Sequence, residues 1–286
     1  MKNNTIVQIV ALLLIAFAII CGFLYFREYM VAQNEISEFS SLRSLYTSDS
    51  PDSLITCSSD DLAFHPISTD AFAPYSDDFL DFSKNTYITG LPKLHVNFEA
   101  LLQINPDIVG WISLPFSTLS YPVVQTSDNF KYLNTSFEGK HSNAGTPFAD
   151  KSNDMQNLDF NTIIHGHNMG AGRTDMFSPL LSYKSYEFFI QNRFLQFDTI
   201  FDQYGWWEVF AVIEIDISTS DFQYHQLIFQ NESDLIAWTN NVTAHSTHKT
   251  NVELSLNDRI LTLSTCDRSN YGENGRLLIL ARSLRP

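Results

Sequence analysis

The chain of 286 residues carries 17 basic and 32 acidic side chains, a formal charge of −15, and three cysteines. Its length suits one large domain with accessory segments, or two modest domains. The negative charge argues against a nucleic-acid partner, because neutralising phosphates takes clustered Lys and Arg. Three cysteines are too few for a disulfide scaffold in a chain of this length, so each is interpreted from its neighbours.

The chain opens with an uncharged apolar segment at residues 5–26, which contains Cys21. About 20 apolar residues in a helix span a bilayer core, whereas the apolar part of a cleaved signal has about 7 to 15. We therefore predict a transmembrane signal anchor within residues 1–27. The charges flanking the span favour an amino terminus inside the cell and a carboxyl terminus outside.

Residues 28–90 form a second region, with a helical composition at 28–45 and an acidic tract after it. Eight aspartates and no Lys or Arg lie between Thr47 and Lys84. Charge of one sign without apolar periodicity predicts a solvated linker after a juxtamembrane helix. Cys57 lies in this tract and has no metal-binding or redox-active companion nearby in the sequence.

Residues 91–286 are predicted to form one compact domain that is mainly β with peripheral helices. A helix is expected at 94–104. Eight β-rich runs follow, at 109–114, 121–125, 146–149, 161–165, 194–201, 207–217, 260–265 and 276–283. Without regular helices between them, these runs predict an eight-stranded, closed or nearly closed β-barrel.

Two longer insertions and one tight turn interrupt this pattern. The sequence DQYG at 202–205 predicts a hairpin turn between the two longest runs. Short helices are expected within 173–189, and a helix capped by Ser233 is expected at 233–244. Ordered insertions on a barrel often form the walls of a binding site.

Cys266 ends the run ILTLSTC and is the cysteine with chemical potential. A cysteine attacks as the thiolate and needs a cation to lower its pKa or a base to accept its proton. Arg276, at the head of the next run, and the histidines of the IIHGHNM segment, His165 and His167, are the candidate suppliers. Gly166 between these histidines is expected to permit a tight turn. A buried small hydrophobe is the alternative for Cys266 alone.

These motifs resemble those of class B sortases, which are membrane-anchored cysteine transpeptidases of Gram-positive bacteria. The resemblance lies in TLSTC at 262–266, RLLILARSL from position 276, GHNM at 166–169, NPDIVGWISL at 105–114 and YPVVQTSDNFKYL at 121–133. It covers nearly all of residues 94–286, with the motifs in the family's order. It implies a sortase-type barrel behind an amino-terminal helix and a transmembrane anchor.

The resemblance also implies the site residues. The nucleophile corresponds to Cys266, the catalytic histidine to His167 and the catalytic arginine to Arg276. The implied substrate contacts are Asn129, Leu133, Ser264 and Thr265. Position 165 is commonly tyrosine in class B, so His165 departs from the family pattern. Asp267 follows the cysteine, where related enzymes also carry an acid.

The implied activity is cleavage of a carboxyl-terminal sorting motif of the Asn-Pro-x-Thr type in secreted proteins. The enzyme would cut after threonine through a thioester and transfer the protein to an amine of a peptidoglycan peptide or its lipid-linked precursor. No cofactor or metal is expected, and the enzyme would act at the outer face of the cell membrane.

Three alternatives remain open from the sequence. A hydrolytic cysteine peptidase would use the same residues but resolve the thioester with water. A zinc-binding surface protein would use His165, His167 and Cys266 as ligands. A non-catalytic adhesin would use the barrel only as a scaffold.

Overall fold

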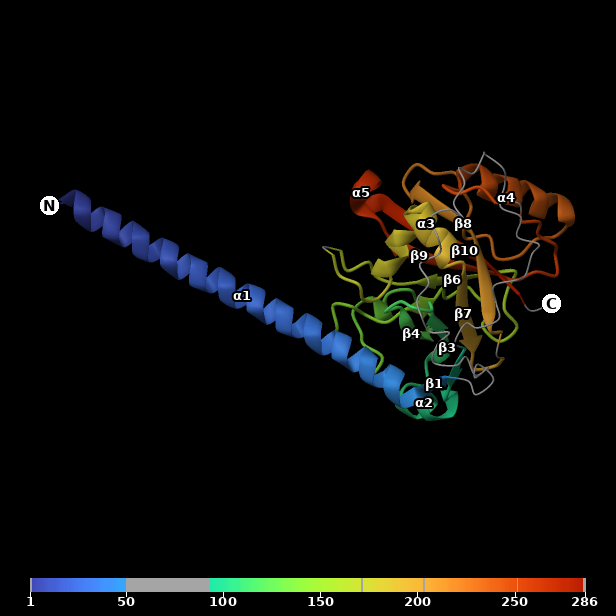
Figure 1. Ribbon diagram of the computed structural model, residues 1–286, viewed down its shortest axis with the longest axis horizontal. Coiled ribbons are helices and arrows are strands. Elements are labelled where there is room, and N and C mark those ends of the chain that lie inside the picture. The colour runs from blue at the N-terminus through green and yellow to red at the C-terminus, as the bar shows by residue number, and fades with distance from the viewer. Residues whose placement is uncertain (1, 50–92, 171, 203, 251, 285–286) are drawn as a thin grey trace, which may run out of the picture. The chain divides into compact units, whose positions relative to one another are not determined.

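The computed structural model describes residues 2–49, 93–170, 172–202, 204–250 and 252–284, without the side chains of residues 2–8 and 49 (Figure 1). The chain divides into two compact units, Met1–Leu42 and Arg43–Pro286. Most of the expected acidic linker, including Cys57, lies outside the described residues.

The first unit lies within α1, a single helix over Lys2–Tyr46. The expected span at 5–26 and the expected juxtamembrane helix at 28–45 therefore share one uninterrupted helix. The part Ile9–Tyr46 is long and apolar enough to cross a membrane, with a mean hydropathy of 2.9 in its most apolar window. The large apolar side chains between Ile9 and Phe26 are exposed, as they are in a helix that lies in lipid.

The second unit begins with a two-stranded antiparallel sheet. Strand β1 (Thr47–Asp49) pairs with β2 (Leu94–Val96), with Asp49 opposite Leu94. The prediction of a helix from residue 94 was thus wrong for its first turn. The helix, α2 (Phe98–Ile104), begins where the Asn97 side chain accepts a hydrogen bond from the amide of Ala100. An asparagine in this position satisfies a free amide of the first turn, so it sets where the helix starts.

Eight strands form a closed barrel in the order β10-β8-β7-β3-β4-β5-β6-β9. They are β3 (Ile108–Ser113), β4 (Ser120–Val124), β5 (Phe148–Ala149), β6 (Asn161–His165), β7 (Phe194–Thr199), β8 (Trp206–Asp216), β9 (Ile260–Cys266) and β10 (Gly275–Ser283). All eight predicted runs are confirmed, with ends that differ by at most two residues. Two strand pairs are parallel, β4 with β5 and β6 with β9, and the others are antiparallel.

The barrel strands are almost entirely buried, and their side chains form the core. Trp111, Ile112, Ile163, Phe197 and Trp207 are at most 2% exposed. Closing the barrel pairs every strand on both sides, which leaves no free edge among the eight. The rigid strand ends are the parts of this fold that hold functional side chains in place.

The insertions contain the expected helices. Strands β7 and β8 pair antiparallel, and in the segment between them the Thr199 amide donates to the Asp202 carbonyl at 2.8 Å. The first insertion contains the 3₁₀ helix η4 (Ser178–Lys184) and α3 (Tyr186–Gln191).

The second insertion contains α4 (Glu232–His245), which packs on β8. Its cap is Asn231, whose side chain accepts from the amide of Asp234. The prediction of Ser233 as the cap was therefore wrong by two residues. Asparagine and serine are both strong caps, and Asn231 lies at the point where the backbone is still extended.

Candidate active site

Strand β9 delivers Cys266 to one end of the barrel. Its residues up to Thr265 are buried, and Cys266 is partly exposed. Because β9 runs parallel to β6 and antiparallel to β10, the carboxyl ends of β6 and β9 meet the start of β10. The topology therefore brings the histidine segment, the cysteine and the arginine to the same end of the barrel.

Arg276 lies directly across the β9–β10 ladder from Cys266. Side chains opposite each other in an antiparallel pair have Cβ atoms about 4.5–5.5 Å apart. The Arg276 guanidinium donates from Nη1 to the carbonyls of Glu273, at 3.0 Å, and Gly275, at 2.8 Å. A Cβ on Gly275 would lie 1.8 Å from the carbonyl oxygen of Asp267, so glycine is required where these strand ends come together.

The turn that carries His167 is bound to β9 by three hydrogen bonds. The Gly166 amide donates to the Ser264 carbonyl at 3.1 Å, and Thr265 Oγ1 donates to the Gly166 carbonyl at 2.8 Å. Asn168 Nδ2 donates to the carbonyl of Cys266 at 2.9 Å. These bonds fix the backbone on both sides of His167 against the strand that ends in the thiol.

His167 also contacts the loop after β4. Its Nε2 lies 2.9 Å from the carbonyl oxygen of Leu133, at the end of the 3₁₀ helix η3 (Lys131–Leu133). A carbonyl only accepts hydrogen bonds, so Nε2 carries the proton in this contact. The other ring nitrogen, Nδ1, has no hydrogen bond to any residue that the structure describes.

Gly166 is needed for a different reason from the one predicted. It is absent from the glycines with positive φ, so the turn itself would accept another residue. A Cβ at this position would lie 2.6 Å from the ring of the buried Phe177. The close approach of that ring, rather than the backbone conformation, excludes a side chain here.

A cavity of about 200 Å³ lies at this end of the barrel. Its lining includes the three candidate catalytic residues and all four candidate substrate contacts: His167, Cys266, Arg276, Asn129, Leu133, Ser264 and Thr265. The structure thus brings together every site residue that the sequence predicted.

The cavity also contains residues that the sequence analysis did not select. They are Phe148, Asp150 and His225, and His165 joins them in the lining. Asp150 directly follows β5 in the chain. His165 Nε2 lies 3.2 Å from Asp150 Oδ2, and this contact holds the pKa of the Asp150 carboxyl well below its usual range.

Asp267 does not line the cavity. Asp267 caps the short helix α5 (Arg268–Tyr271), because its Oδ1 accepts from the amide and hydroxyl of Ser269. Asp267 also forms an ion pair with Lys184. Burial disfavours ionisation, but the hydrogen bonds from Lys184 and Ser269 outweigh it and keep the pKa of Asp267 below its ordinary value of 3.8. Asp267 therefore anchors the segment after the thiol.

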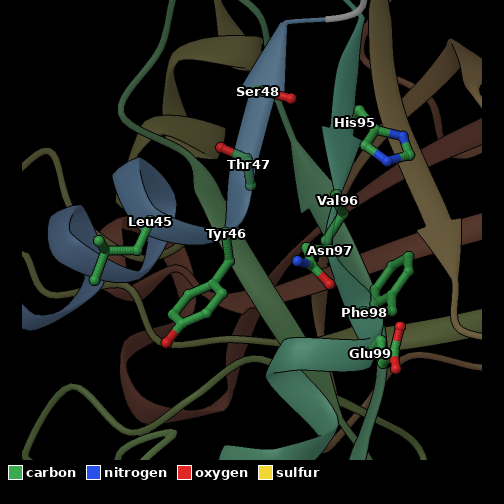
Figure 2. Close-up of a pocket in the computed structure, with 9 residues that line it drawn as sticks. All are labelled: Leu45, Tyr46, Thr47, Ser48, His95, Val96, Asn97, Phe98 and Glu99. Atoms are coloured by element: carbon green, nitrogen blue, oxygen red, sulfur yellow. The ribbon is translucent and has the colours of Figure 1, made fainter.

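A second hollow, of about 550 Å³, lies beside the β1–β2 ladder (Figure 2). Residues 45–48 and 95–99 line it, and it contains none of the candidate catalytic side chains. This hollow is larger than the first, but no cysteine, Lys or Arg lines it, so it offers no candidate nucleophile with a cation beside it.

The geometry gives no support to the zinc alternative. Within the described ranges, no group of three or more His, Cys, Asp or Glu side chains is placed to hold a metal ion. The Nε2 atoms of His165 and His167 are directed to Asp150 and to the Leu133 carbonyl.

Known proteins with similar sequences are sortases. No protein-family model matches the chain. It is 34% identical to sortase B of Staphylococcus aureus over 188 residues, which are 66% of this chain and 75% of that protein. It is 34% identical to sortase B of Listeria monocytogenes over 206 residues, covering 70% of this chain and 81% of that one.

Solved structures of sortase B are also similar to this chain. A complex of Staphylococcus aureus sortase B with substrate is 33% identical and has a TM-score of 0.58, with 65% of this chain and 83% of that chain covered. A complex of sortase B with triglycine is 34% identical, has a TM-score of 0.58, and covers 65% and 84% of the two chains. Sortase B of Clostridium perfringens is 29% identical, with a TM-score of 0.59 over 66% of this chain and all of the other. The eight-stranded barrel and the sequence identity together establish that the chain belongs to the sortase B family of cysteine transpeptidases.

Proposed function

We propose that the chain cleaves a sorting motif in secreted proteins and transfers the new carboxyl end to an amine, with Cys266, His167 and Arg276 as catalytic residues. The observation that carries the proposal is the single cavity that contains these three side chains together with Asn129 and Leu133. Family membership supports the reaction class, and the shared cavity supports the roles that the resemblance implies for these residues.

In the first step, the Cys266 thiolate attacks the carbonyl carbon of the residue before the scissile bond. The carbon–nitrogen bond breaks, a thioester forms on Sγ, and His167 gives a proton to the departing amine. In the second step, an incoming amine attacks the thioester and gives its proton to His167. The thiolate leaves, and a new peptide bond remains. Neither step needs an oxidant or a cofactor.

Arg276 stabilises charge in both steps. A guanidinium is a poor base and a strong hydrogen-bond donor. The place of Arg276 opposite Cys266 on the ladder is suited to a donor for the oxygen of the tetrahedral intermediate.

The substrate we propose is a motif of the Asn-Pro-x-Thr type near the carboxyl terminus of a secreted protein, cut after threonine. Asn129, Leu133, Ser264 and Thr265 would contact the motif along the cavity. The acceptor would be an amine of a peptidoglycan peptide or of its lipid-linked precursor. The solved complexes of sortase B with substrate and with triglycine support a peptide substrate and an amine acceptor of this kind.

We further propose that residues 5–26 of α1 anchor the chain in the cell membrane, with the amino terminus inside and the catalytic barrel outside. The length and apolar surface of α1 support an anchor. The functional regions would then be an anchor at 1–27, a juxtamembrane helix and acidic segment at 28–90, and the catalytic barrel at 91–286.

The test uses the full chain in detergent micelles, a peptide with an Asn-Pro-x-Thr motif, and triglycine. Mass spectrometry of the products should show the peptide joined through threonine to triglycine, and Cys266→Ala should give no product. Cleavage to the free acid at the same rate with and without triglycine would favour the hydrolytic peptidase. Product formation by Cys266→Ala would contradict the assignment of the nucleophile.

A further inference from the structure

Asp150 is a fixed point in the wall of the cavity. Its amide donates to the carbonyl of Ile163 on β6 at 2.9 Å, and its carbonyl accepts from Gln125 Nε2 at 2.9 Å. Its Oδ1 accepts from the amide of Ser152 at 2.9 Å. The residue is 7% exposed, and these contacts fix its backbone and one of its two carboxylate oxygens.

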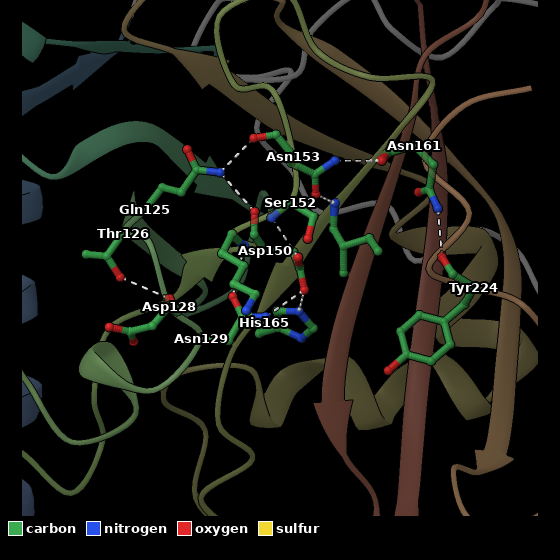
Figure 3. A network of polar contacts seen from close by, with 12 residues as sticks. Gln125, Thr126, Asp128, Asn129, Asp150, Ser152, Asn153, Asn161, His165 and Tyr224 are labelled. Atoms are coloured by element: carbon green, nitrogen blue, oxygen red, sulfur yellow. Dashed lines mark hydrogen bonds and ion pairs between the residues drawn. The ribbon is translucent and has the colours of Figure 1, made fainter.

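The other carboxylate oxygen, Oδ2, joins two side chains of the cavity wall (Figure 3). Asn129 Nδ2 lies 2.8 Å from this oxygen, and His165 Nε2 lies 3.2 Å from it. An ionised carboxylate only accepts hydrogen bonds, so both nitrogens donate to it. The His165 ring also packs on Phe148, with centroids 5.2 Å apart.

The Asp150 contact determines how Asn129 faces the cavity. With Nδ2 bound to Asp150, the carboxamide oxygen Oδ1 accepts from the amide of Lys151 at 2.8 Å. One N–H and one lone pair of Asn129 then remain for a ligand. This donor and acceptor pair is complementary to an amide group, either in a peptide backbone or in a carboxamide side chain.

We propose that His165 is a positioning residue for substrate binding, which acts through Asp150 to hold the carboxamide of Asn129 toward the peptide. This inference rests on the proposed function, because it takes Asn129 as a substrate contact. In the described parts of the chain, His165 makes no hydrogen bond to Cys266, His167 or Arg276. Its effect therefore falls on the binding of the peptide and not on the chemical steps.

The chain offers two matched substitutions at this position. His165→Phe keeps a ring against Phe148 and loses the donor to Asp150. His165→Gln keeps an N–H at a similar distance from the backbone and loses the ring. We expect His165→Phe to raise KM for the motif peptide about three- to tenfold, with kcat changed less than about twofold. His165→Gln should recover most of the wild-type KM.

The route through Asn129 is tested by a double-mutant cycle in the full chain. If His165 acts by orienting Asn129, His165→Phe should have no further effect on KM in the Asn129→Ala background. The control is His245→Phe, the same substitution at an exposed histidine of α4 that stacks on Phe222. It should leave both kinetic constants unchanged.

The outcomes separate this inference from the proposed function. If the wild type turns over and KM is unchanged in His165→Phe, this inference is overturned and the proposed function stands. Additive effects of His165→Phe and Asn129→Ala on KM would have the same consequence. A fall in kcat without a rise in KM would also overturn the inference. Absence of turnover in the wild type would overturn the proposed function and this inference with it. If His165→Phe unfolds at a lower temperature than the wild type, the inference is judged from the KM values of His165→Gln and Asp150→Asn. Asp150→Asn should raise KM as His165→Phe does.

Discussion

Cys266 and Arg276 are direct cross-strand partners, the last residue of β9 opposite the second residue of β10. The separation of their Cβ atoms is therefore set by the hydrogen-bonded ladder of the barrel. Formation of the fold places the cation beside the nucleophile without a mobile loop between them. A site on paired strands keeps its geometry better than one on loops, which makes the contribution of each side chain measurable.

Replacing Arg276 should slow the reaction without unfolding the protein. We expect Arg276→Ala to lower kcat about 10²- to 10³-fold, because one donor to the developing oxyanion is lost. Arg276→Lys should recover only part of this loss, since an ammonium lacks the planar fork of a guanidinium. Steady-state kinetics with the motif peptide and triglycine measures both.

The matched control for this prediction is Arg282→Lys on the same strand. Arg282 binds Glu208 and does not line the cavity. Its replacement should leave kcat unchanged. A kcat above half of the wild-type value in Arg276→Ala would refute the role assigned to this arginine.

His167 can be tested with a variant that keeps its hydrogen bond. In His167→Gln, the side-chain amide can still donate to the Leu133 carbonyl, so the loop should stay in place. Glutamine does not exchange protons near neutral pH, so kcat should fall about 10²- to 10⁴-fold. The unfolding temperature should match that of the wild type, and iodoacetamide should still alkylate Cys266. Near-normal turnover would remove His167 from the mechanism.

The sequence was sufficient to predict the barrel, because its strands are encoded locally, and to select residues that the fold brings into one cavity. Runs such as ILTLSTC carry the β pattern and end in the reactive side chain, so the strand and its function are read from the same few residues. The contribution of Asp150 was missed for the opposite reason. Its role depends on contacts with Asn129 and His165, which lie 21 and 15 residues away along the chain.

Short elements at the edges of the fold were the other source of error. Leu94–Val96 has the composition of the helix that follows it, yet it forms a strand because β1 supplies a partner from before the acidic tract. Pairing across so long an interval leaves no periodic signal in either segment. Gly166 is similar, since only the packed structure reveals the Phe177 ring against it.

The close contact between Gly166 and Phe177 leads to a stability prediction. Gly166→Ala should destabilise the fold by about 1–3 kcal/mol, because its Cβ overlaps the ring. It should also lower turnover, since the turn that carries His167 must shift. Urea unfolding and steady-state kinetics measure the two effects. Phe177→Leu in the same chain should recover part of both, and a double variant no better than Gly166→Ala would contradict this steric explanation.

The ion pair of Asp267 with Lys184 should make stability depend on pH. The pKa of Asp267 is lowered in the fold, so its contribution is present above its ordinary value of 3.8 and is lost as pH falls through the folded value. We expect Asp267→Asn to cost about 1–3 kcal/mol of unfolding free energy at pH 7. The difference from the wild type should shrink below about pH 4.

Urea unfolding at pH 7, 5 and 3 checks this dependence. Lys184→Gln is the partner variant, and the double variant should lose less than the sum of the two single losses. A difference between Asp267→Asn and the wild type that stays constant from pH 7 to pH 3 would contradict the ionic origin of the effect.

The acidic tract should be dispensable for catalysis, because the strand before it, β1, and the strand after it, β2, pair in one antiparallel ladder. Asp49 pairs with Leu94, and the amide of Asn97 donates to the carbonyl of Tyr46 at 2.9 Å. Replacing residues 50–93 by Asn-Gly would join β1 to β2 through a two-residue hairpin turn, which that pair favours. We expect unchanged kcat and KM for the motif peptide, and an equal or higher unfolding temperature, since a two-residue turn between paired strands costs little entropy to close. Replacing residues 47–93 removes β1 as well and should lower the unfolding temperature, because β2 then lacks its partner.

Two outcomes would contradict these expectations. Loss of turnover when Asn-Gly replaces residues 50–93 would show that the tract acts in catalysis. Equal unfolding temperatures of the two variants would show that the β1–β2 ladder contributes nothing to the stability of the fold.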